Sequence, residues 1–326
     1  MKKNATLAAL AALLLAGAAQ AQQVAVPTFT DPGAYNNYIV GEQRELLKKN
    51  LRYISKSAHS DNEKKIANRR LDVVKQNELA LARLARLKAY DGDKDFKDKA
   101  TEALYQQLKV YSVDYKQVDF LAATRTQSYE NMEAYFRAME VAEGKLAAVN
   151  DSVNAAQQRF ARHHAMTISR DPEVERLDKY IEAVSAVNAY QHQVYLAEFR
   201  LEKANARVSD ALAAQDAAAF ETARQQLVED AKAAQTALAA VPAFQGKDAL
   251  YRDATRRMAD FYGGLAANQY VRVKELVEKK NTLSKAEATE FNSFVAFYNK
   301  ESQRVGQAYN QAANAFQATY IPVFND

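Results

Sequence analysis

Apolar residues recur at alternating steps of three and four along two long segments of the chain. The first segment carries nine such positions, which are Met132, Tyr135, Met139, Ala142, Leu146, Val149, Val153, Ala156 and Phe160. A second set, 156 residues later, has the same spacing: Ala288, Phe291, Val295, Tyr298, Ser302, Val305, Tyr309, Ala312 and Phe316. A seven-residue repeat of this kind predicts long helices with a narrow apolar seam, as in coiled coils and helical bundles. We therefore expect the aromatic residues on both stripes to be core residues.

Prolines and capping residues indicate where the other helices begin and end. Ser60-x-x-Glu63 and Ser284-x-x-Glu287 have the pattern of capping boxes, and Asp171-Pro172 has the pattern of a helix start. The segments between are rich in strong helix formers. Together these signals predict four helices in each half, over about 35–58, 61–88, 94–122 and 126–166, then 172–210, 215–240, 247–281 and 285–319. The fold class is all-α, and short loops between long helices favour two tandem up-down four-helix bundles with coiled-coil-like final helices.

The two halves also share local sequence. Ala34-Tyr35 returns as Ala189-Tyr190, and Ala89-Tyr90-Asp91-Gly92 returns as Ala243-Phe244-Gln245-Gly246. We interpret this as an internal duplication, with one repeat over 34–168 and the other over 169–326, preceded by an extended arm over 22–33. The copies differ at Gly263-Gly264, where the first half has Lys109-Val110. We expect a kink or a close helix contact there, specific to the second half.

The first 21 residues have the pattern of a signal peptide. Lys2-Lys3 precede the apolar run from Leu7 to Ala16, and Ala19-Gln20-Ala21 resembles a cleavage site. The run is about half the roughly 20 residues that a spanning helix needs, so we expect no integral membrane insertion. The sequence thus predicts export across an inner membrane to the periplasm, the cell surface or the medium.

Composition narrows the chemistry further. The chain has no cysteine, which excludes disulfides, thiolate metal sites and cysteine nucleophiles. Removing Lys2 and Lys3 lowers the formal charge from +4 to +2. Because both signs are interspersed, we expect no binding to nucleic acid or to anionic membranes.

The four histidines match none of the metal-binding motifs that we considered. Neither Glu-x-x-His, His-Glu-x-x-His nor His-x-x-Glu occurs at His59, His163, His164 or His192. Neighbouring helical side chains point about 100° apart, so His163 and His164 are expected to stabilise the end of their helix rather than to share a metal ion. The sequence predicts no metal, no cofactor and no catalytic residue.

Polar and aromatic residues gather at the start of each half. The candidate binding residues are Tyr35, Asn36, His59, Tyr190 and His192, of which His59 lies in a polar turn where the copies differ. Two interpretations stay open. The tyrosines could pack by their rings as structural residues, or the cluster could form a binding cleft near the junction of the halves.

Three segments carry a resemblance to a known family. They are Tyr35-Asn36-Asn37-Tyr38-Ile39-Val40-Gly41-Glu42-Gln43, Tyr53-Ile54-Ser55-Lys56-Ser57-Ala58-His59-Ser60-Asp61 and Asn188-Ala189-Tyr190-Gln191-His192-Gln193-Val194-Tyr195. These segments resemble a family of bacterial secreted or surface proteins that is named after a leptospiral locus. The resemblance implies an all-helical extracytoplasmic protein of unassigned function, and it brings no site residues with it.

Three functions are compatible with these patterns. The first is a non-enzymatic envelope or surface protein that binds a protein partner through its helices. The alternative is an extracytoplasmic protein that binds a small molecule or a metal through the Tyr/Asn/His cluster. The third is a hydrolase with a dispersed site, which would require a pocket with convergent titratable groups. The sequence does not indicate the oligomeric state.

Overall fold

The computed structural model describes residues 27–58, 62–169, 172–279 and 282–321, and all regular secondary structure in these ranges is helical. The all-α prediction is therefore confirmed. None of the described helices is both long enough and apolar enough to cross a membrane. The predicted signal peptide and His59 lie outside the described residues.

The helices of the first half form what we call the N-terminal group. It contains α2 (Pro32–Ala58), α3 (Glu63–Arg86), α4 (Asp95–Lys109), α5 (Tyr115–Ala122) and α6 (Tyr129–His163). A five-residue π-helical segment, η1 (Val110–Asp114), joins α4 directly to α5, with no non-helical residue between them. These bounds agree with the predicted helices to within a few residues. The last helix, which was predicted to reach residue 166, ends at His163.

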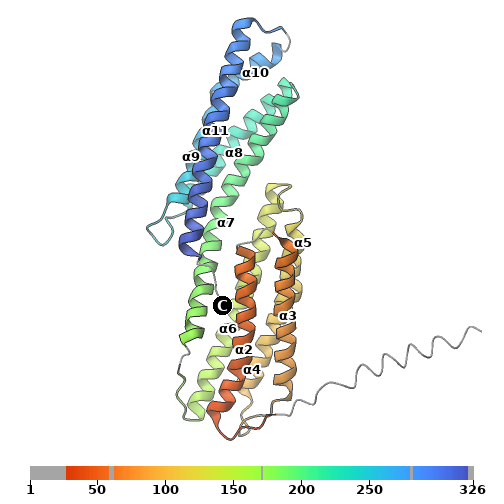
Figure 1. Cartoon of the computed structure of the whole chain (residues 1–326), viewed down its shortest axis with the longest axis vertical. Helices are drawn as coiled ribbons and strands as arrows, with labels where there is room; N and C mark the ends of the chain where they lie inside the picture. Colours follow the sequence, from red (N-terminus) through yellow and green to blue (C-terminus); the bar gives the residue numbers. More distant parts are fainter. Residues whose placement is uncertain (1–26, 59–61, 170–171, 280–281, 322–326) are drawn as a thin grey trace, which may run out of the picture.

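The C-terminal group follows the same order of long helices. It contains α7 (Pro172–Ala213), α8 (Ala217–Ala240), α9 (Leu250–Ala267), α10 (Gln269–Lys279) and α11 (Lys285–Tyr320). Figure 1 shows an elongated molecule with the N-terminal group in its lower part and the C-terminal group above it. The 42-residue helix α7 runs beside the N-terminal group and continues into the C-terminal one.

Capping side chains explain where three helices begin. Asp31 Oδ2 accepts a hydrogen bond from the Ala34 amide at 2.6 Å, so α2 starts at Pro32 and the last two residues of the predicted arm are helical. Asn62 caps α3 by accepting from the Lys65 amide, while Ser60 of the predicted capping box lies outside the described residues. The capping box of Ser284 and Glu287 is confirmed.

Gly263 is a close-packing point, as one of the two interpretations predicted. A Cβ atom on Gly263 would lie 3.0 Å from the Cβ of Ala231 on α8. The helix is interrupted later, at Asn268, whose side-chain amide donates to the Gly264 carbonyl. The helix α9 continues through both glycines to Ala267, and the first half has an irregularity of its own near the corresponding place, the π-helical segment η1.

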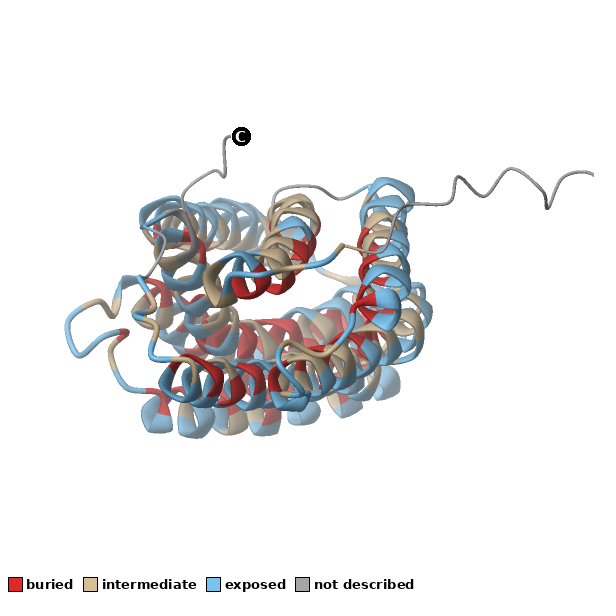
Figure 2. Cartoon of the chain, turned by 90° about the horizontal axis from the view of Figure 1, so that it is seen from below, coloured by how far each residue is buried: buried red, intermediate tan, exposed pale blue. Residues whose placement is uncertain are grey.

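Two separate cores hold the groups together. Buried residues face the inside of each group and exposed residues cover the outside (Figure 2). On the two predicted seams, five positions of α6 are buried and three of α11 are, all of them in the half of α11 that begins at Val305. The seam prediction therefore holds along α6, whereas the first half of α11 is only partly covered.

Candidate functional site

A cavity of about 820 Å³ lies between the N-terminal group and the first half of α7. Successive helices of the group pack on one another, α2 on α3, α3 on α4 and α4 on α6. By contrast the backbones of α2 and α6 rarely approach each other, although Tyr35 of α2 stacks on Phe160 of α6, and α7 packs against both helices. The cavity occupies this opening and also reaches Tyr251 and Gln317 of the C-terminal group. Its size falls within the range of about 300–1,000 Å³ that is typical of small-molecule sites.

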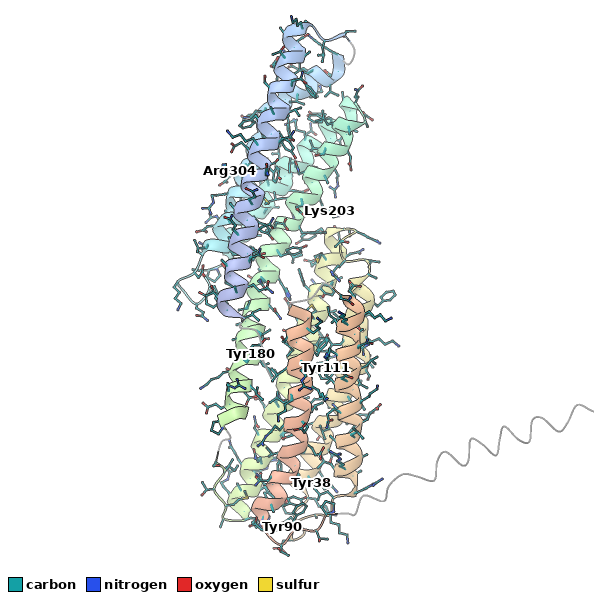
Figure 3. All side chains as sticks on the ribbon, in the orientation of Figure 1. Tyr38, Tyr90, Tyr111, Tyr180, Lys203 and Arg304 are labelled. Carbon is teal, nitrogen blue, oxygen red and sulfur yellow. The ribbon has the colours of Figure 1, made fainter. Side chains whose placement is uncertain are left out.

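Uncharged hydrogen-bonding side chains dominate the polar part of the cavity wall. Besides Tyr251 of the C-terminal group, five tyrosines from α2, η1, α5, α6 and α7 line it: Tyr53, Tyr111, Tyr115, Tyr135 and Tyr195. Burial raises the pKa of all five phenols, and that of Tyr195 to about 12. Their hydroxyls are therefore neutral near pH 7 and can donate as well as accept hydrogen bonds. Figure 3 labels Tyr111 inside the N-terminal group and Tyr180 on the part of α7 beside it.

Side-chain amides supply the other neutral groups. Nine of them line the cavity: Gln43, Asn50, Gln107, Asn150, Asn154, Gln157, Asn188, Gln191 and Gln317. The Oδ1 atom of Asn50 is buried and has no hydrogen-bond partner among the described residues. A buried acceptor without a partner costs free energy, so a ligand that donates to this atom would gain from the interaction.

Glu143 on α6 is the most deeply placed acid of the cavity. Ser185 on α7 donates a hydrogen bond to its Oε2 atom at 3.1 Å, and the Asn188 side chain also bonds to it. Burial raises the pKa of Glu143 above the usual value, and this effect exceeds the lowering by the two hydrogen bonds. A carboxyl group with a raised pKa stays protonated up to a higher pH than an exposed one. In that form it can donate a hydrogen bond as well as accept one.

His192 on α7 also lines the cavity. Its ring stacks on Phe136 with the centroids 3.9 Å apart and an interplanar angle of 15°. The Nδ1 atom lies 3.5 Å from Glu140 Oε1. Burial lowers the pKa of His192, and this effect is larger than the raising effect of Glu140. The imidazole therefore remains neutral to lower pH than an exposed histidine.

Of the five candidate binding residues, the structure places one in the cavity wall. His192 lines it, and Asn36 is connected to it because Gln157, a lining residue, donates to Asn36 Oδ1 at 2.9 Å. Tyr35 and Tyr190 do not line it, and His59 lies outside the described residues. Sequence reasoning missed Glu143, because its burial depends on Ser185 and Asn188 of α7 and the sequence of α6 alone gives no signal for it.

Tyr35 and Tyr190 belong instead to two matching aromatic clusters. In the N-terminal group Tyr35, Tyr90, Phe160 and His164 pack together, with ring centroids 5.4 Å apart for Tyr35 and Phe160. In the C-terminal group Tyr190, Phe244, Phe316 and Tyr320 pack in the same way, with 5.1 Å between Tyr190 and Phe316. Corresponding members are 154 to 156 residues apart in sequence. Both tyrosines are therefore core residues, which is the structural interpretation.

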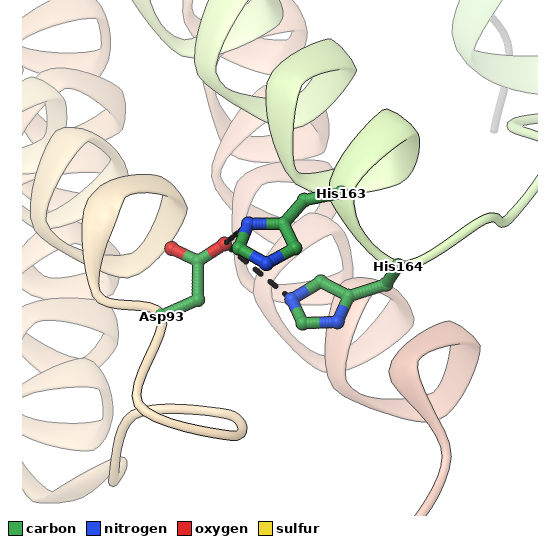
Figure 4. Close-up of side chains that lie close together, drawn as sticks. All are labelled: Asp93, His163 and His164. Atoms are coloured by element: carbon green, nitrogen blue, oxygen red, sulfur yellow. Dashed lines mark ion pairs between the residues drawn. The ribbon is translucent and has the colours of Figure 1, made fainter.

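The first aromatic cluster adjoins a group of titratable side chains. Asp93 Oδ2 lies 3.5 Å from His163 Nδ1 and 3.4 Å from His164 Nε2 (Figure 4). The two imidazole rings are stacked, 4.7 Å apart and within 7° of parallel. The prediction that these rings point apart is wrong, because α6 ends at His163 and His164 has already left the helical conformation. No other group of three or more potential metal ligands was found among the described residues.

A second buried acid lies in the C-terminal group. Glu198 is 3 % exposed, and burial together with the neighbouring Glu202 raises its pKa to about 8. The Tyr309 hydroxyl bonds to it and lies 3.2 Å from the Tyr251 hydroxyl. The first half has Gln43 and Val153 at the positions of Glu198 and Tyr309, so this polar network is specific to the second half.

The chain was compared with models of protein families, with curated proteins and with solved structures. None of these comparisons finds a match. The geometry described above therefore carries the functional argument by itself.

Proposed function

We propose that this protein is an extracytoplasmic binding protein whose small-molecule ligand occupies the cavity between α2, α6 and α7. The observation that carries the proposal is a cavity of about 820 Å³ that combines tyrosine and amide side chains with the buried acid Glu143. A large concave site with a few convergent polar groups is the usual form of a ligand site. The extracytoplasmic location rests on the signal-peptide pattern.

The lining favours an uncharged ligand that carries many hydroxyl or amide groups, such as an oligosaccharide. Tyrosine rings pack against the flat faces of such molecules while side-chain amides pair with their hydroxyl groups. The charged residues of the wall are partly neutralised, since Arg125 is paired with Glu63 at 2.9 Å. Burial also favours the uncharged form of Glu143.

The matching aromatic clusters support a duplicated ancestor for the two groups. They place equivalent rings at equivalent contacts, which is what two copies of one unit would retain. The residues that line the cavity, however, do not all recur at equivalent positions in the other repeat. Glu143 corresponds to Asn299 and Ser185 has no counterpart inside the first repeat. Such divergence is expected where one copy acquired the binding role.

Native mass spectrometry provides the first test. The full chain, purified from cells that export it, should carry a bound mass that disappears after denaturation and refolding. Isothermal titration of the refolded protein with neutral oligosaccharides, and with free amino acids as a contrast, then tests the proposed ligand class.

Two substitutions test the location of the site. Ser185→Trp fills the cavity and should abolish binding, whereas Ser293→Trp places the same side chain on the exposed face of α11 and should leave it intact. Equal ligand binding by both variants would place the site elsewhere, and a wild-type chain without any bound mass or titration heat would refute the proposal.

The other two functions remain predictions. An envelope or surface partner would be tested by affinity capture at native expression, followed by competition with a purified candidate. The hydrolase hypothesis required titratable groups in a pocket, and Glu143 and His192 both line this one. A steady-state assay of Glu143→Gln against wild type on the bound molecule, once identified, would separate hydrolysis from binding.

A further inference from the structure

The side chains of Asp93, His163 and His164 form a triad (Figure 4). It adjoins Tyr90, which Figure 3 labels at the end of the N-terminal group far from the C-terminal group. One ligand atom from each residue lies within 4.8 Å of the other two. We propose that this triad binds a divalent transition-metal cation, for which Zn²⁺ is the best fit. The site is separate from the ligand cavity, whose lining contains none of the three residues.

The distances within the triad suit a shared metal better than direct hydrogen bonds. Good N–H···O hydrogen bonds have donor–acceptor distances of about 2.7–3.2 Å, and both histidines exceed this range with 3.5 and 3.4 Å to Asp93 Oδ2. Around a tetrahedral zinc ion with bonds of about 2.0–2.1 Å, two ligand atoms lie about 3.3–3.4 Å apart. The observed separations therefore match two edges of a zinc coordination sphere.

Local backbone structure holds the carboxylate in place. Asp93 ends the turn that begins at Tyr90, and its amide donates to the Tyr90 carbonyl at 2.8 Å. The turn passes through Asp91 and Gly92 at φ values of 48° and 78°, a conformation that favours glycine at the second position. Asp93 Oδ1 accepts from the Asp95 amide at the start of α4, which leaves Oδ2 directed at the histidines.

The end of α6 brings the two imidazoles together. Ala165 adopts a left-handed conformation with a φ of 49°, and the Met166 amide donates to the Ala161 carbonyl at 2.9 Å. This is the usual way for a helix to end. It turns His164 out of the helical path, so its ring stacks beside that of His163 instead of diverging from it.

The surroundings of His164 are a second, independent observation that points to a metal. Its side chain is only 8 % exposed, yet its Nε2 atom has no hydrogen-bond partner among the described residues. Tyr90 and Phe160 fix the ring, with centroids 5.0 and 4.4 Å away. The side chain of His163, by contrast, is 71 % exposed, so water can supply a further ligand from outside. Two imidazoles and one carboxylate are a typical donor set for zinc.

The C-terminal group supplies an internal comparison. Thr319 and Tyr320 occupy the positions of His163 and His164, and Asp248 ends the corresponding turn as Asp93 does, although that turn is one residue longer. There the Tyr320 hydroxyl bonds directly to Asp248. A similar turn and a matching aromatic cluster are therefore joined by a hydrogen bond in the second half, whereas in the first half they present two nitrogen donors.

Calorimetric titration with Zn²⁺ tests the site in the full chain, without a histidine tag and after dialysis against a chelator. We expect saturable one-to-one binding by wild type. His163→Ala and Asp93→Asn should weaken it by at least about tenfold, since each removes one ligand. Asp248→Asn is the matched control and should bind as wild type does. His163 is exposed, so its replacement should leave the fold intact.

Co²⁺ absorption provides a second measurement that a structural role would not affect. Wild type should show the visible bands of a four-coordinate site, and His163→Ala should lose them while its circular dichroism stays unchanged. The proposal is overturned if wild type shows no saturable Zn²⁺ binding, if His163→Ala and Asp93→Asn bind like wild type, or if Asp248→Asn loses binding equally.

Discussion

The buried tyrosine hydroxyls of this protein differ in whether they have a hydrogen-bond partner. The hydroxyls of Tyr35 and Tyr190 are buried without hydrogen-bond partners among the described residues, although their rings are central to the two cores. The hydroxyls of Tyr251 and Tyr309, in contrast, bond to each other. These differences lead to opposite expectations for otherwise identical substitutions.

Tyr35→Phe and Tyr190→Phe should leave the free energy of unfolding unchanged or raise it by up to about 1 kcal/mol, because each removes an unpaired buried hydroxyl. Tyr251→Phe, the matched control, should lower it by about 1 kcal/mol because a hydrogen bond is lost. Urea denaturation measures all three. A loss on Tyr35→Phe as large as that on Tyr251→Phe would show that the Tyr35 hydroxyl has a partner after all.

Glu198 should make stability depend on pH. Its pKa is about 8 in the folded protein and about 4.3 in an unfolded chain. Between these values the folded state retains a proton that the unfolded state has lost. The contribution of Glu198 to stability is therefore fully present below about pH 4.3 and is lost as pH rises to about 8, by at most about 1.4 kcal/mol per pH unit.

Glu198→Gln keeps a neutral side chain of the same shape, so it should remove this dependence. The variant should match wild type near the acidic end and exceed its stability near the alkaline end, measured by urea midpoints across the range. Glu229→Gln, an exposed position, should follow the wild-type profile. Parallel profiles for Glu198→Gln and wild type would mean that Glu198 is ionised in the folded protein.

At the scale of the helices, the adjacent glycines of α9 differ in their surroundings. A Cβ atom on Gly263 would lie 3.0 Å from the Ala231 Cβ, whereas one on Gly264 would meet no described atom within 4 Å. Gly264→Ala should therefore stabilise the protein by about 0.5–1 kcal/mol through helix propensity. Gly263→Ala should gain less, and Gly263→Leu should lose about 1–3 kcal/mol because α8 and α9 must separate. Thermal unfolding of the three variants tests this order, and equal stabilities for both alanine variants would contradict it.

Helix positions were largely predictable from local signals, and the reasons lie in particular residues. Ser284 with Glu287 forms the cap that the spacing indicated, and Pro172 begins α7 where it was expected. Such signals act within one turn of a helix. The start of α3 was missed by two residues since Asn62, rather than a preceding serine, supplies the observed cap.

The candidate sites were much less predictable, because they depend on contacts between distant segments. The cavity wall includes His192, one of the candidate binding residues, but the burial of Glu143 and its hydrogen bond depend on Ser185 and the rest of α7. The triad depends on Asp93, which lies 70 residues before His163 in the sequence. It depends also on the left-handed conformation of Ala165, for which an alanine gives no sequence signal.

At the scale of the whole molecule, α7 connects the two groups as one uninterrupted helix. Its 42 residues correspond to about 63 Å at the rise of an α-helix. Val184 and Tyr190 already belong to the C-terminal core, while Ile181 and Ser185 line the cavity. The relative position of the groups therefore depends on the stiffness of this helix.

Ala186→Pro tests that dependence at an exposed position of α7. The substitution should cost about 3 kcal/mol or more and bend the helix, which changes the small-angle X-ray scattering profile and weakens ligand binding. Ala186→Gly, which costs about 1 kcal/mol without a steric clash, should retain the wild-type profile. An unchanged profile for Ala186→Pro would show that contacts other than α7 fix the arrangement.

The position of α7 also sets the time at which the cavity is completed during synthesis. A ribosome makes α2 to α6 first, and at that moment the opening between α2 and α6 still lacks its third wall. That wall comes from the first half of α7, whose second half packs on α8 and α9. A nascent chain that stops before α8 would leave α7 poorly anchored and the site unfinished. Ligand binding would then report that the second half of the protein has been made and folded.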